Sequence, residues 1–181
     1  MIHRIETLCL AILMTAASLP ASAGIVSELR GGLLDHASTL VSSGREDGVD
    51  LNLEVVFNSV PYTLGGHPHL GTSFNNDSNN TDHVYAGLTW DGRPVGEFQI
   101  RFALGAAYHN GEKLRFSDEV RGLGNTVLFH FGLDLGWRFS PRWDVSVYAQ
   151  HMSNGPFDGE RGVNDGLDNI GLRLGYHFNP E

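Results

Sequence analysis

The sequence predicts an all-β protein, an eight-stranded antiparallel transmembrane β-barrel, and three observations predict it. Apolar residues alternate with small, polar or charged residues through eight segments. The links between these segments alternate between short and long, and aromatic residues stand near the segment ends. Outer-membrane barrels share these features, because strands of about 9–11 residues cross the membrane between short periplasmic turns and longer outer loops.

Residues 1–23 are predicted to be a signal peptide. A short polar start precedes an apolar stretch over 8–14, and the small residues at 21–23 form an A-x-A cleavage pattern. The apolar stretch is too short to cross a bilayer as a helix. We therefore expect residues 24–181 to form one exported domain. The single cysteine, Cys9, lies in the predicted signal peptide, so we expect no disulfide in the domain.

The composition excludes several other classes of protein. The 181 residues carry 12 Lys and Arg against 21 Asp and Glu, a net charge of −9, so the chain lacks the basic footprint of a nucleic-acid-binding protein. No apolar run of about 20 residues follows the signal peptide, which excludes a helical membrane protein. The 23 glycines have no collagen-like period and indicate strands and turns.

The first half of the domain contains four candidate strands. Segments 25–35 and 67–74 alternate weakly, whereas segment 51–57 has apolar residues at its odd positions. Segment 84–90 has apolar residues at its even positions and ends on Trp90. Because successive side chains of a strand point to opposite faces, each segment is predicted to have one apolar and one polar face.

The second half contains four stronger candidates. Segments 98–109, 142–151 and 168–178 alternate over most of their length. The clearest segment is 127–139, in which every odd position is apolar. These apolar residues are Val127, Phe129, Phe131, Leu133, Leu135, Trp137 and Phe139.

Eight alternating strands also fit a soluble sandwich or a lipocalin-like barrel, with the apolar face inside. The polar face favours the membrane barrel, because it mixes glycine with charges that suit a small barrel interior with internal ion pairs. These charged residues are Arg101, Asp134, Arg138 and Arg173. The link lengths agree: short links are predicted at 91–96 and 140–141, and long polar links at 37–49, 75–82, 110–124 and 152–168. With the N-terminus in the periplasm, the last long link is extracellular.

Three polar residues are predicted on the lipid-facing wall at this outer rim. His151 and Ser153 continue the odd apolar register of segment 142–151, and Asp168 precedes the even apolar register of segment 168–178. Facing residues of neighbouring strands approach to about 5 Å at Cβ. A serine nucleophile needs an adjacent base, and the base needs a carboxylate, so the three form a candidate catalytic triad. The alternative is that they serve solubility and anchoring at the rim.

The loop between these strands holds further candidates. Glu160 and Asp165 compete with Asp168 for the role of the acid. Ester hydrolysis also needs donors for the developing oxyanion, which Pro156 cannot supply because it has no N–H. The candidate donors are Asn154, the Gly155 N–H and Asn164. The alternative is that these residues only shape a turn.

Residues 151–154 read His-Met-Ser-Asn, and residues 164–178 read Asn-Asp-Gly-Leu-Asp-Asn-Ile-Gly-Leu-Arg-Leu-Gly-Tyr-His-Phe. Together they resemble the C-terminal signature of the lipid A 3-O-deacylases of the PagL type. Residues 67–71 with 84–90, and residues 122–129, also look like segments of this family, so the resemblance extends along the predicted domain.

The resemblance implies an eight-stranded outer-membrane barrel whose outward-facing Ser-His-Glu triad hydrolyses the ester at position 3 of lipid A. Ser153 matches the nucleophile, His151 matches the general base, and the acid falls on Asp168, where Asp replaces the Glu of the family. The shorter side chain requires a closer approach of the strands or gives a weaker orienting bond. The link from Ser153 to Asn164 is also longer than the family implies.

We therefore expect a serine esterase of the bacterial outer membrane that removes the 3-O-linked acyl chain of lipid A without a cofactor. Its partner is lipopolysaccharide in the outer leaflet, and a homodimer is an open alternative to a monomer. We expect no metal site, because His67 and His69 lie near no carboxylate cluster. Two other functions stay open: a non-enzymatic barrel for envelope stability or ligand binding, and another lipid acyl hydrolase or transferase.

The predicted outer loops also carry cations. These residues are candidates for contact with the phosphates of lipid A, although scattered surface charge explains them equally well. They are Arg45, Lys113, Arg115, Arg121 and Arg161.

Overall fold

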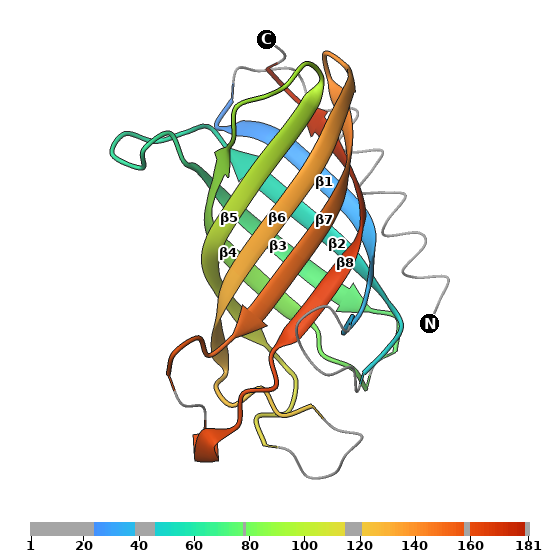
Figure 1. Ribbon diagram of the computed structural model, residues 1–181, viewed down its shortest axis with the longest axis vertical. Helices are drawn as coiled ribbons and strands as arrows, with labels where there is room; N and C mark the ends of the chain where they lie inside the picture. Colours follow the sequence, from blue (N-terminus) through green and yellow to red (C-terminus); the bar gives the residue numbers. More distant parts are fainter. Residues whose placement is uncertain (1–23, 39–45, 78, 115–120, 158–159, 180–181) are drawn as a thin grey trace.

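The chain forms one closed barrel of eight antiparallel strands, in which each strand pairs with the next and β8 pairs with β1 (Figure 1). This confirms the predicted fold class. The computed structural model describes residues 24–38, 46–77, 79–114, 121–157 and 160–179. The predicted signal peptide lies outside the described residues. The strands are β1 (Val26–Asp35), β2 (Val49–Phe57), β3 (His67–Asn75), β4 (His83–Asp91), β5 (Phe98–His109), β6 (Val127–Ser140), β7 (Trp143–Ser153) and β8 (Leu167–His177).

The described residues contain one helical segment, the short 3-10 turn η1 (Glu160–Gly162). Within the described ranges, no helix has the length and apolar character needed to cross a bilayer.

The outer wall of the barrel is apolar. In β6 the alternate side chains of Phe129 and Leu135 are 52% and 51% exposed, whereas His130 and Asp134 between them are 1% and 2% exposed. A soluble sandwich or lipocalin-like barrel places the apolar face inside, so the soluble alternative is wrong. An apolar surface of this extent is stable where lipid, rather than water, is the solvent.

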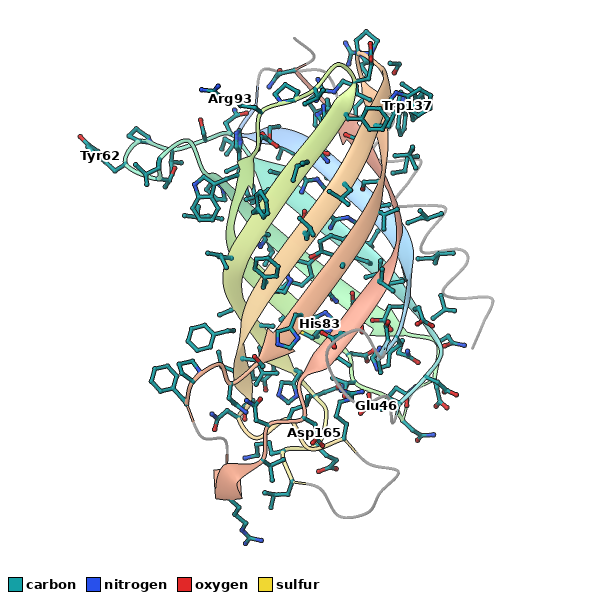
Figure 2. The ribbon with its side chains drawn as sticks, viewed as in Figure 1. Glu46, Tyr62, His83, Arg93, Trp137 and Asp165 are labelled. Carbon is teal, nitrogen blue, oxygen red and sulfur yellow. The ribbon has the colours of Figure 1, made fainter. Side chains whose placement is uncertain are left out.

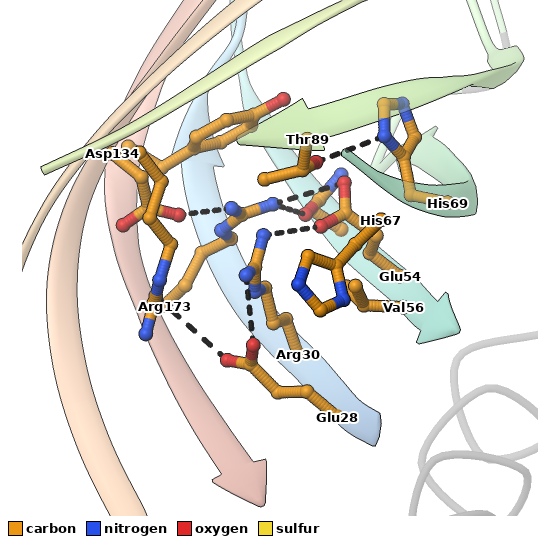
Figure 3. Close-up of polar contacts among 12 residues, drawn as sticks. Glu28, Arg30, Glu54, Val56, His67, His69, Thr89, Asp134 and Arg173 are labelled. Carbon is orange, nitrogen blue, oxygen red and sulfur yellow. Dashed lines mark hydrogen bonds and ion pairs between the residues drawn. The ribbon is translucent and has the colours of Figure 1, made fainter. Parts of the chain in front are cut away.

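The polar side chains that face inward neutralise one another. Arg30 lies 2.7 Å from Glu28 and 2.9 Å from Glu54, and Arg173 pairs with Glu54 at 3.4 Å and also with Asp134 (Figure 3). All five residues are buried. Because burial removes these groups from bulk water, each charge depends on its partners. Of these five, the sequence patterns named Asp134 and Arg173 as candidates for internal ion pairs.

Glycine makes room for large side chains in the lumen. A Cβ added to Gly71 of β3 would lie 2.2 Å from Cζ of Tyr85, which faces it from β4. The Tyr85 ring stacks on His130 with 4.3 Å between the ring centroids, and its hydroxyl accepts a hydrogen bond from Nδ2 of Asn52. Some glycines are therefore required by the packing of the interior.

The two ends of the barrel differ (Figure 1). The β2–β3, β4–β5 and β6–β7 links share one end, the turn end, with the start of β1 and the end of β8. The other four links lie at the opposite end, the loop end. The structure confirms the short links predicted at 91–96 and 140–141, whereas the third link of the turn end, residues 58–66, is longer. Short turns face the periplasm in outer-membrane barrels, which places the loop end outside.

Replacing Arg173 with Leu is expected to lower the free energy of unfolding by about 3–5 kcal/mol, because buried Asp134 would lose its ion-pair partner and buried Glu54 would keep only Arg30. Urea titration of the refolded barrel in lipid vesicles measures this loss. Arg142→Leu is the matched control: Arg142 is exposed, so a loss below about 1 kcal/mol is expected. Equal losses in the two variants would contradict the interior network.

Candidate active site

His151 and Asp168 face each other across β7 and β8 at the loop end. They are register partners, and Nδ1 of His151 lies 2.6 Å from Oδ1 of Asp168. The Asp168 side chain is 3% exposed and the His151 side chain 33% exposed. A carboxylate only accepts hydrogen bonds, so the proton of the neutral imidazole sits on Nδ1 and leaves Nε2 free to accept another.

Ser153 is the last residue of β7 and shares the outward face with His151 two residues before it. Its register partner is Phe129, one of the apolar residues of the outer wall. The hydroxyl oxygen accepts a hydrogen bond from the N–H of Gly155 at 3.3 Å. The structure thus places Ser153, His151 and Asp168 on one outward face at the loop end, as the alternation of the sequence predicted.

Gly155 holds a conformation that favours glycine. Its φ angle is +62°, and a Cβ at this position would lie 2.9 Å from Cδ2 of Phe129. The missing side chain therefore lets the loop close over Phe129 while its N–H points at the Ser153 oxygen. Among the three predicted oxyanion donors, Gly155 is the one whose N–H contacts Ser153.

Asn154 and Asn164 hold the loop together. The Asn154 side chain is buried, and its Nδ2 donates to the carbonyl oxygen of Leu123 at 2.8 Å. The backbone N–H of Asn154 donates to Oδ1 of Asn164 at 3.0 Å. These bonds match the alternative interpretation, in which both residues shape the turn.

The residues that alternate with His151, Ser153 and Asp168 along β7 and β8 pack inside the barrel. Met152 and Leu167 are register partners, and both are fully buried. They belong to an apolar cluster at the loop end that also contains Leu123 and Leu128. This cluster holds the ends of β7 and β8 from inside the barrel. His151, Ser153 and Asp168 lie on the outer faces of these two strands.

Hydrogen bonds join the β5–β6 loop to the β7–β8 loop, which follows Ser153. Oδ2 of Asp165 accepts from the N–H of Gly122 at 2.9 Å, and the Asp165 N–H donates to the Gly122 carbonyl at 3.0 Å. Arg121 is fully buried and donates to the carbonyl oxygen of Gly166. Asp165 therefore has a structural contact of its own. The side chain of Glu160, the other competing acid, lies outside the described part of the structure.

The burial of Arg121 corrects one sequence-based hypothesis. Its guanidinium is buried where the β5–β6 loop meets the β7–β8 loop, so it is unavailable to a phosphate of lipid A. Lys113 and Arg161 are exposed and keep that role open. Arg45 and Arg115 lie outside the described residues.

A chain of polar contacts supports Asp168 from the lumen side, and the sequence patterns did not reveal it. The next residue, Asn169, points inward and its Nδ2 donates to Oδ2 of Asp50 at 2.7 Å. Oδ1 of Asp50 lies 2.8 Å from Nδ1 of His36, whose Nε2 lies 2.9 Å from Oε2 of Glu46. Figure 2 shows Glu46 and Asp165 at the loop end. No local pattern links these residues, because they come from the β1–β2 link, β2 and β8.

His36 is protonated at neutral pH. Burial of the imidazolium opposes protonation, but hydrogen bonds and charge from Asp50 and Glu46 outweigh it and raise the pKa of His36 to about 9. The contact with His36 in turn holds the pKa of Glu46 below its ordinary value, against the effect of its own burial. His36 thus donates from both ring nitrogens and joins the β1–β2 loop to the rim.

An apolar groove with a volume of about 280 Å³ is lined by Phe129, the register partner of Ser153, and by Asn154 and Phe157. Phe129 and Phe157 stack over it with 5.9 Å between their ring centroids. The small residues Gly105 and Ala106 of β5 contribute to its lining. The groove has the apolar character that a fatty acyl chain requires.

One group of described residues has the ligand types and spacing of a metal site: Glu28, Asp144 and His177, buried in the lumen. Arg101 lies 2.8 Å from Asp144, and Arg30 lies 2.7 Å from Glu28, so guanidinium groups already supply positive charge to these carboxylates. Glu28 and His177 belong to the turn end, so this group is at the opposite end of the barrel from His151.

This chain resembles known proteins in both sequence and fold. A family model described as lipid A 3-O-deacylase (PagL) matches residues 42–177. The crystal structure of the outer membrane enzyme PagL matches with a TM-score of 0.59 and 16% identity, over 82% of this chain and 98% of that one.

Two further solved structures are similar to this chain. The solution structure of the designed protein TMB2.3 gives a TM-score of 0.49 and 14% identity, over 88% of this chain and 100% of that one. Neisserial surface protein A gives a TM-score of 0.45 and 12% identity, over 85% of this chain and 96% of that one. Among curated proteins, no sequence matches this chain.

The raised pKa of His36 predicts a pH-dependent stability. The folded value of about 9 exceeds the ordinary value of about 6.5, so the stabilisation is fully present below about pH 6.5 and is lost as the pH rises through about 9. Unfolding of the native chain and of His36→Gln should be compared between pH 6 and 10. We expect the difference in their free energies of unfolding to shrink across that range, and a constant difference would contradict a charged His36.

Proposed function

The chain belongs to the lipid A 3-O-deacylase (PagL) family, and on that premise we propose that Ser153, His151 and Asp168 form the catalytic triad of the enzyme. Membership of the family makes the protein an outer-membrane hydrolase that acts on an ester bond. The proposal concerns the residues that perform the reaction and the place on the barrel where they do so.

The observation that carries the proposal is the contact of 2.6 Å between His151 and Asp168 on the outward face. Charged groups on the lipid-facing wall of a barrel cost free energy, by an amount that falls toward the interface. This pair lies at the loop end and stands outside the ion-pair network of the lumen. An oriented imidazole on that face, two residues from a serine, is the arrangement that nucleophilic catalysis needs.

We propose the following reaction for these residues. Nε2 of His151 takes the proton of the Ser153 hydroxyl as Oγ attacks the carbonyl carbon of the 3-O-acyl ester. The N–H of Gly155 stabilises the negative charge on the carbonyl oxygen, and Asp168 stabilises the imidazolium. His151 then returns the proton to the departing sugar oxygen. In the second half, His151 activates a water molecule that releases the fatty acid and restores Ser153.

The position of the site suits a substrate that stays in the membrane. The triad is at the predicted outer rim, where the esters of lipid A in the outer leaflet are within reach. The groove between β5, β6 and Phe157 provides an apolar path for the acyl chain beside Ser153. All three triad residues come from one chain, so the proposal needs no second copy.

The register explains how an Asp serves in place of a Glu. His151 and Asp168 are directly opposed in the β7–β8 pairing, and at 2.6 Å the shorter side chain already reaches Nδ1. The sequence left open whether the strands approach more closely or the orienting bond is weaker. The contact of 2.6 Å supports a close approach of the strands. An added methylene would push against this contact.

Ser153→Ala is expected to abolish the deacylase activity, because alanine has no hydroxyl to attack the ester. Mass spectrometry of lipid A from cells that express the native chain should show the loss of one 3-O-linked acyl chain, and lipid A from cells with the variant should not. The mobility of the unheated barrel in SDS gels provides the control for folding. Activity that persists in Ser153→Ala would overturn the assignment of the nucleophile.

Asp168→Asn should keep the fold but lower kcat by about 10³–10⁴-fold, because an amide no longer stabilises the imidazolium or fixes its tautomer. Asp168→Glu keeps the charge, so it should retain more activity than Asp168→Asn. Initial rates on purified lipopolysaccharide in detergent measure both. A rate for Asp168→Asn within a few-fold of the native rate would exclude Asp168 as the acid.

Gly155→Ala should lower the rate by about 10²-fold, because the new Cβ would meet Phe129 and move the N–H away from the oxyanion. Gly162→Ala is the matched control in the same loop: its φ angle is +74°, but a Cβ there meets nothing within 4 Å. We expect the control to keep most of its activity. Similar losses in both variants would assign the effect to backbone strain rather than to the donor.

A further inference from the structure

The β2–β3 link at the turn end differs from the other links at that end. Residues 58–66 form a projection that extends sideways from the barrel, with Tyr62 at its tip (Figures 1 and 2). Tyr62 and Leu64 are 102% and 95% exposed, and Val60 is 43% exposed. Large apolar side chains are therefore presented on a segment that contributes nothing to the interior of the barrel.

The projection has a defined structure. The Thr63 hydroxyl lies 2.8 Å from the carbonyl oxygens of both Val60 and Gly66, and the Gly66 N–H donates to the Thr63 carbonyl at 2.9 Å. Tyr62 and Leu64 have φ angles of +71° and +54°, in the left-handed region that such residues rarely adopt. The hydrogen bonds around Thr63 hold this conformation and point the two side chains outward.

The base of the projection is fixed to the lipid-facing wall. The indole N–H of Trp90 donates to the carbonyl oxygen of Thr63 at 2.9 Å, and a Cβ on Gly66 would lie 2.8 Å from the same indole nitrogen. Trp90 belongs to the outward row of β4 together with Val84. The projection thus starts from the apolar wall itself rather than from the aqueous mouth of the barrel, and Figure 2 shows Tyr62 at about the level of Trp137.

The sequence of the projection suits the membrane interface. Residues 58–66 contain no charged side chain, whereas the β4–β5 link carries Arg93 and Glu97 and the β6–β7 link carries Arg142. Tyrosine and tryptophan concentrate where acyl chains meet headgroups, because their rings are apolar and their polar atoms reach water. Tyr62 and Trp90, whose indole binds the base of the projection, provide this pair.

We propose that residues 58–66 are a lateral anchor that binds the phospholipid leaflet at the turn end, with Val60, Tyr62 and Leu64 inserted at the boundary between headgroups and acyl chains. The anchor extends the apolar wall of the barrel on the β2–β3 side alone. It holds that side at a fixed depth, in the leaflet opposite the proposed active site. The inference rests on the outer-membrane location of the family and is independent of the triad.

Fluorescence of a probe at the tip tests the proposal. In a Cys9→Ser background, Tyr62→Cys carries the only thiol and is labelled with a nitrobenzoxadiazole dye. The barrel is refolded into vesicles of phosphatidylethanolamine and phosphatidylglycerol that contain spin-labelled phospholipids. We expect a blue shift of the emission and quenching by a shallow spin label. Both leaflets have the same lipids, so the orientation of the barrel does not affect the result.

Arg93→Cys in the same background is the matched control, because Arg93 is exposed on another link at the turn end (Figure 2). Its probe should emit as in water and escape quenching. Leu64→Cys gives a second site on the tip, and gel mobility confirms folding of each variant. Water-like emission at both positions 62 and 64 would overturn the proposal. Protection of the dye from water that increases with the protein-to-lipid ratio would assign the tip to contact with a second copy of the chain. That result would also overturn the proposal.

Discussion

An apolar outer wall obliges the polar side chains of this barrel to satisfy one another inside. Arg30, Glu54, Arg173 and Asp134 are buried, and their contacts join β1, β2, β6 and β8 across the lumen. A shift of one residue in any of these strands would turn its charges toward lipid and its apolar residues toward the ions. The ion pairs and the lipid-facing rows therefore select the same register, and the rest of the structure depends on that register.

The rim of the loop end is where the interior network and the outer wall meet. Asp168 and Asn169 are consecutive, and they point to opposite faces of β8. Asp168 contacts His151 outside, and Asn169 contacts Asp50 inside. The polar chain that continues to His36 and Glu46 thus supports the backbone of the proposed acid. The proposed triad lies on the outer wall, where few polar partners exist, and polar contacts in the lumen hold its backbone in place.

Much of the fold was predictable because each strand carries its own signal. The alternation in β6 is complete over 127–139, so both the strand and its outward face followed from local sequence. Segments 25–35 and 67–74 alternate weakly, because residues that are not apolar, such as Ser27, Gly31 and Thr72, interrupt their outward rows, and they were only the weaker candidates. The link 58–66 was not distinguished in advance, because its outward projection depends on a hydrogen bond from Trp90 of β4.

For the site, the sequence determined which residues share the outward face, because parity along β7 and β8 is a property of each strand alone. The resemblance of its C-terminal segments also predicted a Ser-His-acid triad. Only the tertiary structure decided that His151 and Asp168 stand directly opposite each other, since the long loop between Ser153 and Leu167 leaves the register free. It also decided that the Gly155 N–H points at Ser153, and that Arg121 is buried. These features depend on contacts between distant segments, which no local pattern records.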